Sequence, residues 1–316
     1  MYKNKRVCVV VPAYNEEGLI ERVITTIPQF VDKIIVVDDR SKDATAAKVR
    51  AIMPLYKDRL VLICHEKNKG VGGAIVTGYK ESLKLNMDIS CVMAGDAQMD
   101  PEELNLIVDP VADGKADYAK GNRLIYGEAW KKIPKLRYLG NSVLSLLTKI
   151  SSGYWHIADS QTGYTAISNE ALRHLALDGI YKRYGYPNDL LVRLNVINCR
   201  IKDVSIKPIY NIGEDSGIRL YKVIPTLSLL LLKRFIWRLK EKYIIRDFHP
   251  LVFFYFMGFV LFLTGIFLMG LFIAKFSRGY ISVPSVVISV FCLISSLQLI
   301  LFAMWFDMDY NRDLKS

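Results

Sequence analysis

Polar and acidic side chains gather at three points in the first third of the chain, each directly after a short apolar run. They occupy residues 12–17 (PAYNEE), 38–43 (DDRSKD) and 94–101 (AGDAQMDP). Any one of them alone is more typical of a surface turn or a helix N-cap. If the apolar runs are strands of one parallel sheet, all three clusters meet at its carboxyl edge, where such sheets bind ligands. Oxygen ligands gathered there suit a divalent cation and the hydroxyls of a nucleoside, since Mg²⁺ is commonly held by one or two carboxylates plus substrate phosphates.

The elements that must position these clusters are readable from hydrophobic patterning. Short apolar runs rich in β-branched residues lie at 6–11, 33–37, 60–64, 89–93 and 117–120, and the segments between them carry apolar residues at helical spacing. This alternation predicts an α/β fold, a mostly parallel, doubly wound sheet with helices on both faces. A glycine-rich turn at 68–74 follows the third run, and it would suit close approach of the backbone to a nucleotide. It matches neither G-x-G-x-x-G nor a P-loop, which disfavours dinucleotide binding and P-loop NTP hydrolysis.

The last part of the chain is strongly apolar. Residues 251–274 form 24 positions without a charge, which as a helix extend about 36 Å and can cross a hydrocarbon core of about 30 Å. Residues 284–306 give a second span, with a short hairpin between the two. Residues 233–247, just before the first span, contain six Lys and Arg and two acidic residues, whereas the hairpin contains two cations. This bias predicts a multi-pass membrane protein with its N-terminal domain and both termini in the cytoplasm.

Residues 221–247 mix leucines and aromatics with Lys and Arg. The pattern predicts an amphipathic helix lying in the membrane interface, its cations toward anionic headgroups. The alternative is a helix that packs on the soluble domain. We therefore expect a catalytic domain at 1–220, an interfacial helix region at 221–247 and a membrane anchor at 248–316.

Six motifs, taken together, resemble one family. The chain is similar to the GT-A glycosyltransferases of family 2, and within it to the polyprenyl-phosphate sugar transferases, the group of the dolichyl-phosphate mannose and glucose synthases. The motifs run in family order over residues 5–220, and they are PAYNE at 12–16, VDDRSKD at 37–43, NKGVGGA at 68–74, DAQMDP at 96–101, GNR at 121–123 and DSQTGY at 159–164. The resemblance implies the Rossmann-like GT-A fold, which agrees with the sheet predicted above.

The resemblance also implies roles for individual residues. The nucleotide-sugar would be held by Pro12, Tyr14, Glu16, Val37, Asp39, Gly95 and Asp96. Asp96 and Gln98 would ligate Mg²⁺ or Mn²⁺ on the diphosphate. The family's D-x-D here reads Ala94-Gly95-Asp96, so one carboxylate is missing. Either the metal affinity is lower, or Asp38, Asp39 or Asp100 compensates directly or through water.

The acceptor side is assigned in the same way. By resemblance the acceptor phosphate would be gripped by Arg123, Arg137, Arg219 and Lys222, the last two lying in a region that only loosely echoes the family's late basic element. Asp159 stands where the family keeps an acid close to the reacting centre; it would orient hydroxyls or act as a base. Asp96, Asp159 and Arg123 are the expected catalytic residues. The four histidines show no paired metal spacing, and structural roles are expected for them.

The expected reaction moves one hexosyl residue from a nucleotide-sugar to polyprenyl or dolichyl phosphate at the cytoplasmic face of the bilayer, with inversion and metal assistance. A phosphate monoester has a second pKa near 6 and is mostly dianionic at pH 7, so it is itself the nucleophile and needs no dedicated base. Cations must bring the two polyanions together. A UDP-sugar is favoured as donor; UDP-glucose, UDP-N-acetylglucosamine and GDP-mannose all present the same diphosphate.

Other readings stay open. A processive polysaccharide synthase shares the fold but carries a different late motif and more spans, and a non-enzymatic nucleotide-sensing scaffold is conceivable because of the missing aspartate. The net charge of +11 raises nucleic acid as a partner, yet no helix-turn-helix, RNP-like or zinc-finger pattern appears. Five widely spaced cysteines without C-x-x-C indicate reduced thiols and no zinc site. A homo-oligomer, a tetramer by family resemblance, is expected.

Overall fold

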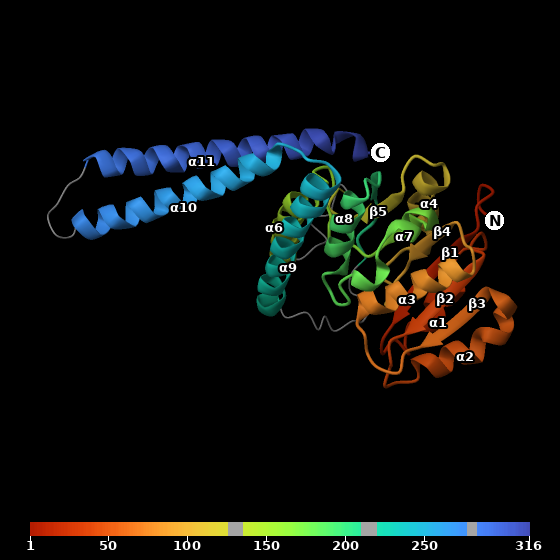
Figure 1. Cartoon of the computed structure of the whole chain (residues 1–316). Coiled ribbons are helices and arrows are strands. Elements are labelled where there is room, and N and C mark those ends of the chain that lie inside the picture. Colours follow the sequence, from red (N-terminus) through yellow and green to blue (C-terminus); the bar gives the residue numbers. More distant parts are fainter. Residues whose placement is uncertain (126–134, 210–219, 277–282) are drawn as a thin grey trace. The chain divides into compact units, whose positions relative to one another are not determined.

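The computed structural model describes residues 1–125, 135–209, 220–276 and 283–316 (Figure 1). The chain forms two compact units. The first comprises Met1–Phe235 together with Asp313–Ser316, and the second comprises Ile236–Arg312. The boundary falls inside one helix, α9 (Leu220–Lys240).

The first unit is built on a seven-stranded sheet in the order β3-β2-β1-β4-β6-β5-β7. β6 pairs antiparallel with both β4 and β5, and all other neighbours are parallel. The predicted mostly parallel sheet is therefore confirmed. The strands are β1 (Val7–Ala13), β2 (Lys33–Asp38), β3 (Leu60–Cys64), β4 (Ile89–Val92), β5 (Tyr118–Asn122), β6 (Thr165–Ser168) and β7 (Ile201–Ser205).

Helices cover both faces of this sheet because successive strand side chains point to opposite sides. Along β1, Val7, Val9 and Val11 enter one buried cluster, while Cys8 and Val10 enter the other. The first face carries α1 (Ile20–Thr26), α2 (Thr45–Tyr56) and α4 (Leu104–Ala112). The second carries α3 (Val71–Lys84), α7 (Asn169–His174) and α8 (Tyr186–Val196), and short 3-10 helices lie at Lys57–Arg59, Pro101–Glu103, Leu177–Gly179 and Arg312–Leu314.

A further pair of helices joins the first unit. α6 (Lys135–Ser152) and the N-terminal part of α9 pack through a small leucine cluster of Leu144, Leu227 and Leu231, extended by Leu147 and Leu230. α9 falls within the segment predicted to be amphipathic. Its Leu229 and Leu232 side chains are more than half exposed.

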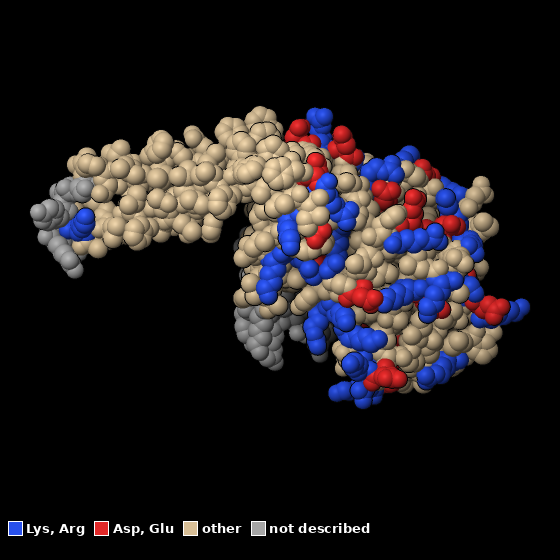
Figure 2. Space-filling model, in the orientation of Figure 1, with Lys and Arg blue, Asp and Glu red and all other residues tan. Residues whose placement is uncertain are grey.

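The second unit holds the two apolar helices predicted from sequence, α10 (Leu251–Phe276) and α11 (Val283–Tyr310), after a π-helical segment at Glu241–Arg246. Both are long and apolar enough to cross a membrane. Gly258 and Gly265 let them pack closely: a Cβ on Gly258 would lie 2.9 Å from Ile300 Cγ1. The visible face of the pair carries charged side chains only toward the helix ends (Figure 2).

A buried ion pair ties the start of the second unit to the end of α11. Arg238 and Asp307 are both fully buried, with Nη1 2.8 Å from Oδ1 and Nη2 3.0 Å from Oδ2. The Tyr243 hydroxyl also donates to Asp307, and Asn311 Nδ2 donates to that hydroxyl at 2.8 Å. Lys242 Nζ donates to Asn311 Oδ1 at 2.8 Å, so the cluster is closely hydrogen-bonded.

Candidate active site

The three polar clusters lie at one edge of the sheet and are bonded to one another. Asp39 N donates to Ala13 O at 2.9 Å, which joins the ends of β1 and β2. Gly95 N donates to Pro12 O at 3.1 Å, which joins the ends of β1 and β4. A Cβ on Gly95 would lie 3.3 Å from Pro12 O and 3.4 Å from Glu16 Cγ. Four residues predicted to hold the nucleotide, Pro12, Glu16, Asp39 and Gly95, are thus brought together.

The loops after β1 and β2 are cross-braced by side-chain to backbone hydrogen bonds running both ways. Asn15 N donates to Ser41 Oγ at 2.9 Å, and Lys42 N donates back to Asn15 Oδ1 at 2.8 Å. The same pattern continues with Glu16 N to Thr45 Oγ1 at 2.8 Å, Glu17 N to Asp43 Oδ2 at 3.0 Å, and Ala44 N to Glu17 Oε2 at 2.9 Å. We call residues 13–17 and 38–45, bonded in this way, the braced rim.

Asp39 joins the rim to the loop after β3. Its carboxylate is buried and accepts hydrogen bonds at 2.7 Å from His65 Nδ1, Lys69 N and Gly70 N. His65 Nε2 in turn lies 2.8 Å from Thr77 Oγ1, so His65 has the structural role expected for it. Asp39 therefore fixes the loop at 65–70 beside the predicted nucleotide site, and its contact with the nucleotide itself stays a prediction.

The glycine-rich turn makes its close backbone approach to the chain itself. Gly73 N donates to Lys182 O at 3.1 Å. A Cβ on Gly72 would lie 2.3 Å from Tyr181 O, and one on Gly70, where φ is +82°, would lie 2.5 Å from Lys182 O. The glycines are needed because the segment at 181–182 lies against the start of α3. This internal contact accounts for the glycines, and the approach of the turn to a nucleotide stays a prediction.

Two other predicted nucleotide residues differ in exposure. Tyr14 is 42% exposed at the edge, where its ring is accessible. Val37 is fully buried, and its side chain packs in the core cluster under α3. Any contact of Val37 with a ligand would therefore come from its backbone.

Asp96 and Gln98 follow β4 as expected for a cation site. Asp96 Oδ1 accepts from Gln98 N at 3.1 Å, and Ala97 between them has φ of +56°. Burial raises the pKa of Asp96, with Gln98 N and the Arg123 charge acting in the opposite direction. Among the described residues no group of three or more His, Cys, Asp or Glu is arranged to hold a metal.

The acids considered for the missing carboxylate of the D-x-D motif differ in their hydrogen bonds. Asp100 Oδ1 accepts from Glu102 N at 3.0 Å and caps the 3-10 helix at Pro101–Glu103. Asp38 keeps one buried oxygen, Oδ1, without a hydrogen bond, while Oδ2 accepts from Ser41 N at 3.2 Å. Both oxygens of Asp39 accept hydrogen bonds, whereas Asp38 and Asp100 each retain one oxygen that accepts none from the described residues, and compensation by any of the three stays a prediction.

Arg123 and Asp159 form a two-pronged ion pair. Arg123 Nε lies 2.8 Å from Asp159 Oδ2 and Nη2 lies 3.3 Å from Oδ1. Asp159 is fully buried and also accepts from Arg123 N at 3.3 Å and Gln161 N at 3.0 Å. Burial opposes ionisation and is the largest single influence, but the charge and hydrogen bond of Arg123, the Lys120 charge and the Gln161 N–H together outweigh it, so the pKa of Asp159 is lowered. A carboxylate held ionised by four donors orients Arg123, whose side chain is 20% exposed, and is a poor proton acceptor.

Three further polar residues lie near this pair; Asn122 belongs to the GNR motif, whereas Lys120 and Asp203 were not singled out from the sequence. Lys120 and Asn122 on β5 are fully buried, and Asp203 on β7 accepts from Asn122 Nδ2 and from Ala158 N, the latter at 3.0 Å. The signal that points to them is a lysine inside a run otherwise typical of a buried strand. A lysine buried there requires anionic partners.

The remaining predicted acceptor residues are only partly placed. Arg137 lies on α6 and Lys222 on α9. Their side chains, and Arg219 as a whole, lie outside the described residues. Their proposed grip on a phosphate stays a prediction.

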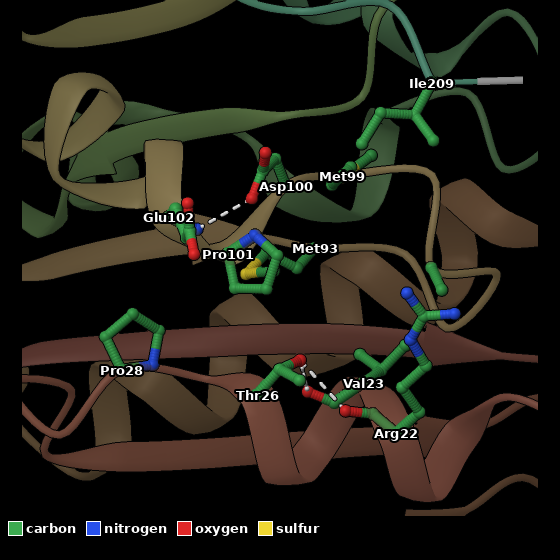
Figure 3. Close-up of a pocket in the computed structure, with 11 residues that line it drawn as sticks. Arg22, Val23, Thr26, Pro28, Met93, Met99, Asp100, Pro101, Glu102 and Ile209 are labelled. Carbon is green, nitrogen blue, oxygen red and sulfur yellow. Dashed lines mark hydrogen bonds between the residues drawn. The ribbon is translucent and has the colours of Figure 1, made fainter.

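A cavity of about 450 Å³ lies between α1 and residues 97–102 (Figure 3). Arg22 and Thr26 line it from α1, and Met99 and Pro101 line it from the other side. Asp100, one of the acids considered for the metal site, lines this cavity, and so does Ala97, which lies between Asp96 and Gln98. The cavity therefore adjoins the loop that carries the predicted cation site.

Comparison with known proteins gives a consistent result. Residues 8–176 match the family described as glycosyl transferase family 2. The UDP-N-acetylglucosamine–dolichyl-phosphate N-acetylglucosaminyltransferase of Methanococcus voltae is 32% identical over 219 residues, which is 66% of this chain and 87% of that protein. The undecaprenyl-phosphate mannosyltransferase of Micrococcus luteus is 31% identical over 64% of this chain and 82% of its own.

Among solved structures, glucosyl-3-phosphoglycerate synthase from Mycobacterium tuberculosis with bound UDP aligns with a TM-score of 0.53. The two chains are 21% identical, and the alignment covers 74% of this chain and 80% of the other. Another structure of that synthase contains Mn²⁺, UDP-glucose and phosphoglyceric acid and aligns equally well, with a TM-score of 0.53 at 20% identity over 74% of this chain and 80% of the other. These likenesses establish the fold.

Proposed function

Because the chain belongs to glycosyl transferase family 2, we propose that it transfers a single hexosyl residue from a nucleotide-sugar to the phosphate of a membrane-embedded polyprenol. The M. voltae and M. luteus relatives are named for transfer to dolichyl and undecaprenyl phosphate. The observation that carries the proposal is that Asp96, a predicted cation ligand, and the Arg123–Asp159 pair follow β4 and β5, whose carboxyl ends lie at the same edge of the sheet on either side of the antiparallel β6. The Arg123 charge acts on the Asp96 carboxyl.

The donor is held at the braced rim. Tyr14 offers an exposed ring there, and Glu16 and Gly95 lie beside one another. A UDP-sugar is favoured as donor, since the M. voltae relative is named for UDP-N-acetylglucosamine.

The cation is proposed to be Mg²⁺ or Mn²⁺, held by Asp96 and Gln98. Both side chains offer hard oxygen ligands, which these ions prefer, and a buried carboxylate whose pKa is raised by burial gains from a nearby cation. When bound, the ion neutralises the diphosphate leaving group.

The acceptor phosphate is proposed to bind Arg123. Asp159 fixes the guanidinium so that its remaining N–H groups point in a constant direction, and a guanidinium fork matches phosphate oxygens well. The phosphate oxygen attacks the anomeric carbon as the bond from that carbon to the nucleoside diphosphate breaks, and the electron pair leaves with the diphosphate. Attack from the opposite side inverts the anomeric centre. The dianionic phosphate needs no base, which agrees with Asp159 being saturated by donors.

The anchor fits a lipid-linked acceptor. α10 and α11 are proposed to span the membrane, because both helices are long and apolar enough to do so. α9 is proposed to lie at the membrane interface and the catalytic unit in the cytoplasm, because α9 carries basic residues ahead of the first span. Such an arrangement keeps the enzyme at the surface where the polyprenyl phosphate resides.

The test uses the purified full chain in lipid nanodiscs with undecaprenyl or dolichyl phosphate. UDP-glucose, UDP-N-acetylglucosamine and GDP-mannose, each radiolabelled, are supplied with Mn²⁺, with Mg²⁺ or with EDTA. We expect one sugar per lipid with one donor, lost with EDTA and reduced at least 100-fold in Asp96→Ala. Asp58→Ala, an exposed acid outside the site, is the matched control and should keep full activity. A polymeric product, or no labelled lipid with any donor, would reject the proposal.

A further inference from the structure

We propose that Asp203 is a positioning residue for the acceptor-binding arginine, acting together with the buried Lys120. The inference rests on the proposed function, since it takes Arg123 as the group that grips the acceptor phosphate. It adds a second layer to that site, on strands β5 and β7, that prepares Arg123 without touching substrate.

One oxygen of Asp203 bridges the two segments that carry the ion pair. Asp203 Oδ2 accepts from Ala158 N at 3.0 Å, and Ala158 directly precedes Asp159. The same oxygen accepts from Asn122 Nδ2, and Asn122 directly precedes Arg123. Any displacement of the Asp203 carboxylate is therefore transmitted to both partners of the Arg123–Asp159 pair.

Asn122 extends this hold to the turn after β5. Its Oδ1 accepts from Leu124 N at 2.9 Å and from Ile125 N at 3.2 Å. The Asn122 side chain thus stabilises a backbone turn that contains Arg123. The amide is satisfied on one side by the turn and on the other by Asp203. Rotation of Asn122 away from Asp203 would free the turn that fixes Arg123 N against Asp159 Oδ2.

Lys120 supplies the charge that keeps Asp203 in place. The two residues are paired in register on the parallel strands β5 and β7, so both side chains leave the same face of the sheet. Lys120 is fully buried and donates to Thr162 O. Asp203 Oδ1 is buried with no hydrogen bond from the described residues. Lys120 and Arg123 are thus two buried or half-buried cations, and Asp159 and Asp203 are the two anions near them. When all four are ionised, their charges sum to zero.

The net charge of these four residues is zero near neutral pH, because Lys120 and Asp203 are both ionised between their pKa values. Burial lowers the pKa of Lys120 to about 8, against the pull of Asp159 and Asp203. Burial raises the pKa of Asp203 to about 6, where Ala158 N, Asn122 and Lys120 favour the ionised form and the Asp159 charge opposes it. Tyr118, on the same strand as Lys120, is buried with its pKa raised and stays neutral. Above about pH 6 Asp203 is ionised and holds both segments; as the pH falls below that value it takes up a proton and the charge opposite Lys120 is lost.

The experiment measures acceptor binding separately from transfer. The purified full chain is titrated with a short-chain polyprenyl phosphate and, in parallel, with UDP, for the wild type, Asp203→Asn and the control Asp117→Asn. Asp117 is also an acid of the β5–β7 edge, but its ion pair with Arg200 is solvent-exposed. We expect Asp203→Asn to weaken polyprenyl phosphate binding at least tenfold at pH 7.5 with UDP affinity within twofold, and Asp117→Asn to change neither.

The pH profile gives a readout that a merely structural role would not move. In the wild type the affinity should fall below pH 6 with two titrating groups, the acceptor phosphate and Asp203; in Asp203→Asn only the phosphate should titrate. If Asp203→Asn fails to fold, Asn122→Ala removes the bridging amide and keeps all four charges, and it should weaken the same affinity.

The outcomes separate the two proposals. Binding by Asp203→Asn that matches Asp117→Asn, or an unchanged two-group pH profile, overturns the role of Asp203. A wild type that binds polyprenyl phosphate, loses it in Asp203→Asn and yet transfers no sugar supports the positioning role and rejects the proposed transferase reaction.

Discussion

Nε of Arg123 lies 2.8 Å from Oδ2 of Asp159 although 36 residues separate the two along the chain. The antiparallel strand β6 makes this meeting possible, because it returns the segment before it to the end of β5, where Gly121 N donates to Tyr164 O at 2.8 Å. A wholly parallel sheet would carry residues 159–164 to the opposite edge. The single reversed strand is thus what completes the acceptor side of the site.

The Arg123–Asp159 pair should act as a unit. Arg123→Lys keeps the charge but loses the fork, and we expect kcat/KM for polyprenyl phosphate to fall 10- to 100-fold, about 1.4–2.7 kcal/mol. Asp159→Ala should have a similar effect, and the double variant Arg123→Lys/Asp159→Ala should be no worse than the poorer single one. Steady-state kinetics measure this, with thermal denaturation as the folding control. Additive effects of the two single changes would contradict a coupled pair.

Gly72 should tolerate no side chain. Gly72→Ala would place a Cβ 2.3 Å from Tyr181 O and 2.8 Å from Tyr186 Cβ, and both are backbone or near-backbone atoms that cannot swing away. We expect a loss of about 1–3 kcal/mol in the free energy of unfolding and weaker nucleotide binding, because the turn is fixed to Asp39. Chemical denaturation and UDP titration test this. Gly18→Ala, which meets no atom within 4 Å, is the control, and an equal loss there would refute the steric explanation.

His156 should make stability depend on pH in the acid range. Burial lowers its pKa to about 4 from an ordinary value of 6.5, while its Nε2–H donates to Ile201 O at 3.2 Å. The unfolded chain therefore binds the proton more tightly, so this contribution to stability is complete above pH 6.5 and is lost as the pH falls toward 4. Between pH 7.5 and 5 the loss from this residue should be about 2 kcal/mol.

The measurement for His156 is the melting temperature across that pH range. His156→Gln cannot titrate, so its curve should be flatter than that of the wild type. Identical slopes for the two proteins would show that His156 does not contribute.

Removing one partner of the buried Arg238–Asp307 pair should destabilise the anchor unit strongly, whereas replacing both partners by apolar residues should destabilise it little. Arg238→Met leaves Asp307 buried without its cation, and we expect a loss of about 3–5 kcal/mol in stability of the anchor unit. Arg238→Met/Asp307→Leu removes both charges and should recover most of that loss. Thermal unfolding in detergent tests both, with Lys240→Met, an exposed cation two positions along, as control. A double variant as unstable as Arg238→Met would argue against charge burial as the cause.

The apolar strands of the sheet could be predicted from the sequence, whereas the strands that are short or mix charged with apolar residues could not. β1 to β5 are visible as apolar runs within two residues of their observed ends. β6 has four residues, and β7, with the sequence IKDVS, mixes charge with apolar residues, so neither stands out by pattern. Their order and the reversal of β6 depend on long-range pairing, which local periodicity does not encode.

For the site, sequence reasoning located the three strand ends because polar clusters follow strands directly. It did not find what those clusters bond to. Ser41 and Asp43 are of the residue types that commonly cap helices. Ser41 instead accepts from Asn15 N, and α2 begins after Ala44 without a capping side chain, although Asp43 accepts from Thr45 N. His65, Lys120 and Asp203 act through partners from distant parts of the chain, which only the folded structure brings together.

The braced rim has a thermodynamic consequence for whatever donor enters. Five hydrogen bonds within the chain itself hold residues 15–17 against residues 41–45. Binding of the donor therefore costs little conformational entropy in these loops, so the braced rim is preorganised. The affinity for the donor should depend only weakly on loop ordering. Donor selectivity then has to arise from shape and hydrogen-bond complementarity in a rigid frame, and a rigid frame discriminates among similar bases better than one that adapts to each.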